Sequence, residues 1–193
     1  FPFWKDVSYR FGGPLVSDYA RFVADNRRDG DTVLLAARDG YNIEKVLNVL
    51  RPEIETHYVY VPRILNVLIG SNYTQHTDYR KKIVKAFYGD VEDPDAYFES
   101  HREEIGKKRS ELLKAFRSRI ASETGEPDSI TAVDVTTLKY SSQKLIMDVF
   151  PGSDVQGIYY FLLIESDLKH RAYHVRKRVL KLADNINITE FFM

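Results

Sequence analysis

Short apolar runs alternate along the chain with longer segments whose apolar residues recur at helical spacing. Residues 32 to 37 form an apolar run between Asp31 and Asp39, a pattern typical of a strand buried on both faces of a parallel sheet. The apolar residues that follow recur one helical turn apart, at Ile43, Val46, Leu47 and Leu50. The pattern predicts a strand, a charged turn at Arg38 to Gly40, and a helix from about Tyr41.

The same alternation predicts the other elements of an α/β fold. Helical spacing extends from Pro14 to Gly30, and residues 57 to 63 resemble a strand that ends at Pro62. Residues 129 to 150 repeat the order strand, polar turn, helix; residues 155 to 164 predict a strand, and residues 166 to 185 a helix with a basic face. No hairpin signal separates these strands, so we expect an open, mostly parallel Rossmann-like sheet flanked by helices.

A change of composition marks a helical insertion within this fold. Residues 77 to 124 are highly charged and helical in pattern, with one apolar stripe that we expect to be buried, at Leu112, Leu113, Phe116 and Ile120. We therefore predict a single α/β domain over residues 1–193 with an all-helical insertion or cap over residues 75–126. The chain starts at Phe1 and ends just after an apolar stretch, which suggests a domain of a longer polypeptide.

Composition narrows the possible functions. The 28 basic and 28 acidic residues balance, which argues against nucleic acid as the partner, and no apolar stretch is long enough to span a bilayer. The absence of cysteine excludes thiolate catalysis and disulfides and fits a reducing compartment. We expect a cytoplasmic protein.

Three polar segments follow predicted strands, where open parallel sheets bind ligands. They are the Arg38 to Tyr41 turn, Pro62 and Arg63, and the segment from Asp134 to Ser142. Basic and hydroxyl groups suited to an anion such as a phosphate are Arg38, Arg63, Lys139 and Ser141. Groups suited to sugar hydroxyls or to Mg²⁺ are Asp39, Asp134, Thr136 and Thr137.

For a single loop of this kind, a purely structural interpretation is the simpler one. Asp39 would cap the helix, Gly40 would permit the turn, and Arg38 would pair with Asp39. Neither a P-loop nor a Rossmann glycine motif is present. The D-x-D-G-T motif of haloacid-dehalogenase (HAD) phosphatases would put Ala37 at the nucleophile position, which excludes that mechanism at this turn.

The segment after the third predicted strand is similar to a phosphoribosyltransferase loop, with Asp134, Thr136 and Thr137 in place. Residues 138–140 replace the glycines that would let the backbone approach a phosphate. His170 and His174 have the spacing of a two-histidine metal site on a helix, but their basic surroundings favour a solvated face.

Four blocks in order resemble a known family. They are "YRFGGPLVSDYARFV", "TVLLAARDGYNIEKVLNVL", "YVYVPR", and "VDVTTLKYSSQKLI" followed by "VQGIYYFLL". They look like the domain after the HAD-like region of predicted HAD-superfamily hydrolases found with bacterial surface-polysaccharide glycosyltransferases. The resemblance implies a bacterial cytoplasmic protein linked to surface-glycan assembly, with Arg38, Asp39, Arg63 and Asp134 at the family's polar turns.

Three functions remain open from the sequence. The leading hypothesis is an accessory or degenerate-enzyme domain that binds a phosphorylated or nucleotide-linked sugar, with Mg²⁺ as the candidate cofactor. The second is a non-catalytic interaction domain that docks a glycosyltransferase through the helical insertion and the basic terminal helix. The third is a divergent phosphoribosyltransferase-like enzyme, which requires Asp134 for activity.

Overall fold

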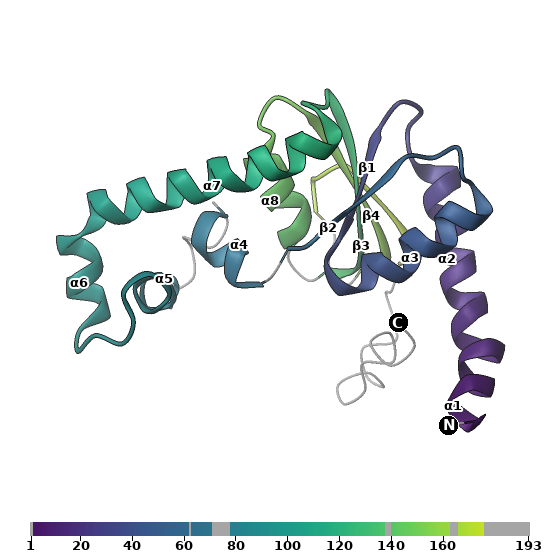
Figure 1. Ribbon diagram of the computed structural model, residues 1–193, viewed down its shortest axis with the longest axis horizontal. Helices are drawn as coiled ribbons and strands as arrows, with labels where there is room; N and C mark the ends of the chain where they lie inside the picture. The colour runs from purple at the N-terminus through teal and green to yellow at the C-terminus, as the bar shows by residue number, and fades with distance from the viewer. Residues whose placement is uncertain (1, 62, 71–77, 138–139, 163–165, 176–193) are drawn as a thin grey trace. The chain divides into compact units, whose positions relative to one another are not determined.

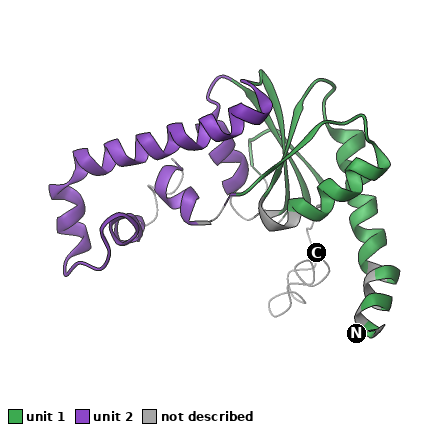
Figure 2. Cartoon of the chain, in the orientation of Figure 1, with its two compact units in different colours: residues 1–60, 127–140, 153–193 green, residues 61–126, 141–152 purple. Residues whose placement is uncertain are grey.

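The computed structural model describes residues 2–61, 63–70, 78–137, 140–162 and 166–175 (Figure 1). The chain divides into two compact units, which are described separately (Figure 2). The first unit comprises residues 1–60, 127–140 and 153–193, and the second comprises residues 61–126 and 141–152. Whether the two together form a single domain with an insertion stays a prediction.

Among the described residues, five strands form one parallel sheet in the first unit. They are β1 (Thr32–Ala36), β2 (Thr56–Val59), β3 (Ser129–Thr137), β4 (Asp154–Leu162) and β5 (His170–Val175). Their order is β2-β1-β3-β4-β5, and every neighbouring pair is parallel. Leu35 of β1 is in register with Tyr58 of β2 and Val133 of β3. The open parallel α/β sheet predicted from the sequence is confirmed.

Two helices of the first unit, α2 (Gly13–Asn26) and α3 (Ala37–Leu50), cover one face of this sheet (Figure 1). The helix α1 (Pro2–Val7) and a π-helical turn η1 (Ser8–Gly12) precede α2. The core under α2 and α3 is built from apolar side chains of both helices and of the facing strand positions, including Tyr19, Val23, Val33, Leu35, Ile43, Leu47, Val133 and Ile158. The strands contribute alternate residues because successive side chains point to opposite faces.

The bounds of α2 follow from local chemistry. Pro14 lies in the first turn, where its missing N–H removes no intrahelical bond. The helix ends at Asn26, and Arg27 is already extended. Gly30 has a φ of +83°, a left-handed conformation that glycine adopts without steric cost, and it turns the chain into β1.

The second unit is helical in its described residues. Its helices are α4 (Arg63–Ile69), α5 (Tyr79–Tyr88), α6 (Pro94–Ser100), α7 (Arg102–Thr124) and α8 (Ser141–Val149). The helices α4 to α7 enclose a small apolar core that includes Ile83, Val84, Phe98 and Ile105. The helical character predicted for residues 77 to 124 is confirmed over the described residues 78 to 124, whereas α4 was not predicted.

The α7 stripe is less buried than expected. Ile120 is buried, but Leu112, Leu113 and Phe116 are only half-buried. No helix in the described part of the chain combines the length and the hydropathy needed to cross a bilayer.

One predicted helix is wrong. Within residues 166 to 185 the structure has the strand β5, which pairs in parallel with β4 along His170 to Val175. Tyr173 lies in an aromatic cluster with Tyr160 and Phe22, with ring centroids 5.5 and 5.3 Å away, so cross-strand packing outweighs the helical pattern. In a strand, the Cα atoms of His170 and His174 are about 13 Å apart, which excludes the two-histidine metal site expected for a helix. Residues 176–185 lie outside the described part.

Candidate functional site at the carboxyl edge of the sheet

The order of the strands sets a topological switch point between β1 and β3. The chain proceeds from β1 through α3 to β2 on one side, while β3 and β4 lie on the other. In doubly wound sheets with this order, ligands bind beyond the carboxyl ends of the two strands at the switch point. The edge where β1 and β3 end is therefore the first place to look for a site.

The helix α3 starts at this edge directly after β1. Ala36 is the last residue of β1 and the N-cap of α3, and Ala37 is already helical. The segment predicted as a charged turn is thus the first turn of a helix, and the prediction of a start near Tyr41 was four residues late. The N-cap residue Ala36 makes no side-chain cap hydrogen bond, and the side chain of Asp39 is not described, so a capping role for Asp39 stays a prediction.

Gly40 lets this first turn lie close against β1. A Cβ atom on Gly40 would be 2.9 Å from the carbonyl carbon of Leu35 and 3.1 Å from its carbonyl oxygen. Gly40 does not have a positive φ, so its role is the close approach of helix and strand rather than the permissive turn expected from the sequence. The close approach fixes the start of α3, and with it the first-turn N–H groups, at the carboxyl end of β1.

Asp134 lies level with the start of α3 on the neighbouring strand. Leu35 and Val133 are in register, so Ala36 and Asp134 follow side by side at the strand spacing of about 4.8 Å. Val133 and Val135 point into the core under α2 and α3, so Asp134 faces the other side of the sheet. Its carboxylate is half-buried and accepts a hydrogen bond from the N–H of Val135, at 2.8 Å.

Buried tyrosines surround Asp134. The Tyr19 hydroxyl lies 2.7 Å from the carbonyl oxygen of Asp134 and 2.9 Å from that of Ile158, and it donates to this pair of acceptors. Tyr159 is in register with Asp134 on β4. Burial raises the pKa of both phenols well above 10, and the negative charge of Asp134 raises each further. Both hydroxyls therefore stay protonated at neutral pH.

Tyr140 closes the segment after β3 in a conformation that favours glycine. Its φ is +54°, and it is the only described residue other than glycine with a positive φ. The ring is buried, with its centroid 5.4 Å from that of Tyr159 and 5.3 Å from that of His170. A tyrosine thus adopts the left-handed conformation at a position where the phosphoribosyltransferase loop would have glycine.

The structure brings only some of the predicted site residues together. Arg38 and Asp39 are in the first turn of α3, one strand away from Asp134, and Thr136 and Thr137 end β3. For these five residues the backbone is described but, apart from Asp134, the side chains are not.

The structure does not place the other predicted residues relative to this edge. Arg63 is the first residue of α4 and Ser141 the first residue of α8, both in the second unit. Lys139 lies outside the described residues. Their part in one site with Asp134 stays a prediction.

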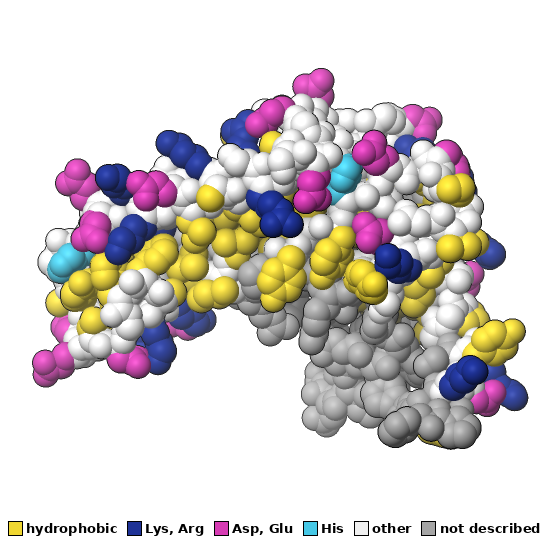
Figure 3. Space-filling model, viewed as in Figure 1, with side chains coloured by type: hydrophobic (Ala, Val, Ile, Leu, Met, Phe, Trp, Pro, Cys, Tyr) yellow, Lys and Arg dark blue, Asp and Glu magenta, His cyan; other side chains and the backbone are white. Residues whose placement is uncertain are grey.

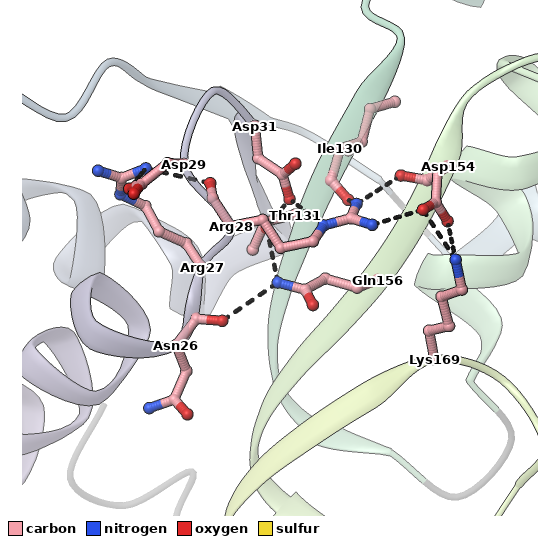
Figure 4. A network of polar contacts seen from close by, with 10 residues as sticks. All are labelled: Asn26, Arg27, Arg28, Asp29, Asp31, Ile130, Thr131, Asp154, Gln156 and Lys169. Atoms are coloured by element: carbon pink, nitrogen blue, oxygen red, sulfur yellow. Dashed lines mark hydrogen bonds and ion pairs between the residues drawn. The ribbon is translucent and has the colours of Figure 1, made fainter.

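Sequence reasoning missed a polar network at the opposite edge of the sheet (Figure 4). Asp31 precedes β1 with its carboxylate almost wholly buried; it pairs with Arg28 at 3.0 Å and accepts a hydrogen bond from Thr131. Arg28 also contacts Asp154 at the start of β4, with 2.6 Å between Nη1 and Oδ2. Lys169 Nζ lies 2.8 Å from both carboxylate oxygens of Asp154.

Gln156 extends this network to the end of α2. Its Nε2 donates to Thr131 Oγ1 at 3.1 Å and to the carbonyl oxygen of Asn26 at 3.2 Å, which satisfies an acceptor in the last turn of α2. Several of the contacts join residues 100 or more positions apart, such as Asp31 with Thr131 and Arg28 with Asp154, so the only signal in the sequence was the charged run before β1. The network ties α2, β1, β3 and β4 together, which is a structural role.

The comparisons with known proteins do not add a relative. No protein family model matches the chain. No curated protein matches it.

Among the described residues, no group of three or more His, Cys, Asp or Glu side chains is placed to hold a metal ion. Mg²⁺ often takes only one or two carboxylates and completes its shell with substrate oxygens, so Asp134 still suits a substrate-bridged ion.

Proposed function

We propose that the first unit binds a phosphorylated or nucleotide-linked sugar at the carboxyl edge between β1 and β3. The domain would serve surface-glycan biosynthesis as an accessory or degenerate enzyme. The link to glycans rests on the family resemblance of the sequence blocks. The binding site rests on the arrangement of the described residues.

The observation that carries the proposal is the meeting of two features at the switch point. The N-cap residue of α3, Ala36, makes no side-chain cap hydrogen bond. The helix start offers first-turn N–H groups and the positive end of the helix dipole, which favour an anion. Half-buried Asp134 lies one strand away and offers a carboxylate for sugar hydroxyls or Mg²⁺. A sugar phosphate carries a phosphate for the helix start and hydroxyl groups for the carboxylate on one small molecule.

The predicted residues of the first unit have roles in this proposal. Arg38 binds the anion, and Asp39 and Asp134 bind sugar hydroxyls or a substrate-bound Mg²⁺. Thr136 and Thr137 would supply further hydrogen bonds around the phosphate, and parts for Arg63, Lys139 and Ser141 in the same site stay predictions from the sequence.

A thermal-shift screen tests the proposal. Sugar nucleotides, phosphoribosyl pyrophosphate and Mg²⁺ are added singly and in pairs at millimolar concentration. A ligand at about 100 times its Kd stabilises the native state by about 2.7 kcal/mol, which raises Tm by about 5–10 °C for a chain of this size. Asp134→Asn should reduce the shift, whereas Asp25→Asn, which changes an exposed carboxylate on α2, should retain it.

Two outcomes would count against the proposal. If none of the ligands raises Tm, the interaction-domain hypothesis is favoured, in which the polar residues serve only the fold. If a ligand shifts Tm equally in the wild type and in Asp134→Asn, the site lies elsewhere. Phosphoribosyl transfer that is insensitive to Asp134→Asn would exclude the phosphoribosyltransferase alternative.

A further inference from the structure

We propose that Tyr41, Tyr58 and Lys45 form a ring-binding subsite beside the start of α3, so that the ligand is a phosphate ester carrying a nucleobase or a pyranose. The inference rests on the proposed function, because it concerns the part of the same ligand that lies next to its phosphate. A free phosphate or a simple acidic ligand has no ring and would not contact this subsite.

Tyr41 is an exposed aromatic side chain held in a fixed place. Its side chain is 51 % exposed although it lies only one turn into α3. The Tyr58 ring contacts it edge to face, with centroids 6.0 Å apart and an interplanar angle of 82°. Lys45, one turn further along α3, places its Nζ 5.1 Å from the centre of the Tyr41 ring. Two neighbours thus restrain a ring that water still reaches.

The end of β2 adds to this aromatic surface. Tyr58 is in register with Leu35, whose side chain packs under α2 and α3, so Tyr58 lies on the face of the sheet that α3 covers. Tyr60 follows the last residue of β2 and is 64 % exposed. Figure 3 shows hydrophobic side chains at the surface over the start of α3, with basic side chains beside them.

The position of Tyr41 relative to the helix start connects the ring to the anion. Ala37 begins α3 and Tyr41 is four residues further on, a rise of about 6 Å along the helix axis. A phosphate bound by the N–H groups of the first turn would therefore have an aromatic surface one turn away. The distance suits the phosphate and the ring of a single small ligand.

The chemistry of the surface favours a ring over other occupants. Stacking on an aromatic side chain tolerates any planar base, and an apolar face of a pyranose packs on a tyrosine in the same way. Lys45 adds a cation next to the ring, which complements a second phosphate or another negative group on the same ligand.

Calorimetric titration of the whole chain tests the subsite. The probes are uridine diphosphate, a hexose phosphate and inorganic pyrophosphate, which share the anion and differ in the ring. At least one ring-bearing probe should bind more tightly than pyrophosphate. Tyr41→Ala should weaken that probe by about 5- to 150-fold, the range for loss of one stacked base, and leave pyrophosphate unchanged.

Two further variants keep the test independent of folding. Tyr41→Phe retains the ring and should retain affinity, whereas Val49→Ala removes another exposed side chain of α3 and should change nothing. If ring-bearing and ringless probes bind equally well, or if Tyr41→Ala weakens them equally, the subsite is overturned and the anion site stands. If none of the probes binds the wild type, the proposed function and the subsite are both overturned.

Discussion

Replacing Gly40 by alanine tests how closely α3 is seated on β1. The added Cβ would lie 2.9 Å from the carbonyl carbon of Leu35, 3.0 Å from its Cβ and 3.1 Å from its carbonyl oxygen. Two of these three neighbours are backbone atoms, which cannot move aside by changing a rotamer. We therefore expect the first turn of α3 to shift away from β1.

A second glycine provides the matched control. Gly106 lies inside α7, and a Cβ there would meet nothing within 4 Å. Gly106→Ala should stabilise the protein by about 0.5–1 kcal/mol, because alanine has the higher helix propensity. Gly40→Ala has the same gain in propensity but carries an overpacking cost of about 1–3 kcal/mol. The difference between the two variants isolates the steric cost of the close approach.

Urea denaturation of both variants, followed by circular dichroism, measures this difference. Gly40→Ala should have a free energy of unfolding about 1–3 kcal/mol lower than that of Gly106→Ala. Equal stabilisation by the two substitutions would refute the close packing of α3 on β1. In that case Gly40 would not fix the position of the helix start.

Three further predictions concern the polar network and the segment after β3. Arg28→Met should lower the free energy of unfolding, measured by urea denaturation, by about 3 kcal/mol, because it leaves the buried carboxylate of Asp31 without its cation. The hydrogen bond from Lys169 holds the pKa of Asp154 below its usual 3.8. The stability that this carboxylate contributes is therefore present above pH 3.8 and is lost as the pH falls through the lower pKa of the folded state. Asp154→Asn should lose less stability than the wild type on acidification, as followed by circular dichroism. Tyr140→Gly should be about 1–2 kcal/mol more stable than Tyr140→Ala, because only glycine adopts the left-handed φ without strain.

Each of these three has a contrary result. Arg21→Ala removes an exposed ion pair with Asp18 and should change stability by about 0.5 kcal/mol or less, so an equal effect of Arg28→Met would contradict a structural role for the network. An acid-side stability profile of Asp154→Asn that parallels the wild type would mean that the ion pair with Lys169 does not stabilise the fold. Greater stability of the alanine variant at Tyr140 would contradict the left-handed backbone.

The apolar pattern predicted the strands of the switch point well. The run from Val33 to Ala36 is typical of a strand buried on both faces, and the same pattern predicted β3 and β4. Such runs are local and independent of partners, so the sequence is sufficient to place them. The order of the strands depends on pairing between distant segments, and no local pattern in the sequence indicates that pairing.

Two errors came from local rules that tertiary packing overrides. The charged residues Arg38 and Asp39 resemble a turn with a cap, but α3 begins at Ala37 because the chain passes from strand to helix without a loop. The segment from His170 to Val175 has a basic pattern that favours a helix, but its Tyr173 packs on the aromatic cluster of the sheet and the segment becomes β5. Neither outcome could be deduced from spacing alone.

The candidate site itself stays a prediction. The sequence indicated Asp134 and the segment from Arg38 to Gly40, and the structure brings their backbones side by side through the register of β1 and β3. The tyrosines next to Asp134 could not be predicted as its neighbours, because contacts such as that of Tyr19 with the Asp134 carbonyl join residues 115 positions apart. The steric role of Gly40 was equally hidden, since it depends on its distance from Leu35.

Hydrogen–deuterium exchange with and without uridine diphosphate tests the location of the anion site most directly. At saturating ligand, the first-turn amides of α3, residues 37 to 41, and those at the end of β3 should exchange more slowly, because bound amides are protected. The account predicts protection at both of these places and its loss in Asp134→Asn. Protection confined to other elements, or binding that leaves the start of α3 unprotected, would contradict it.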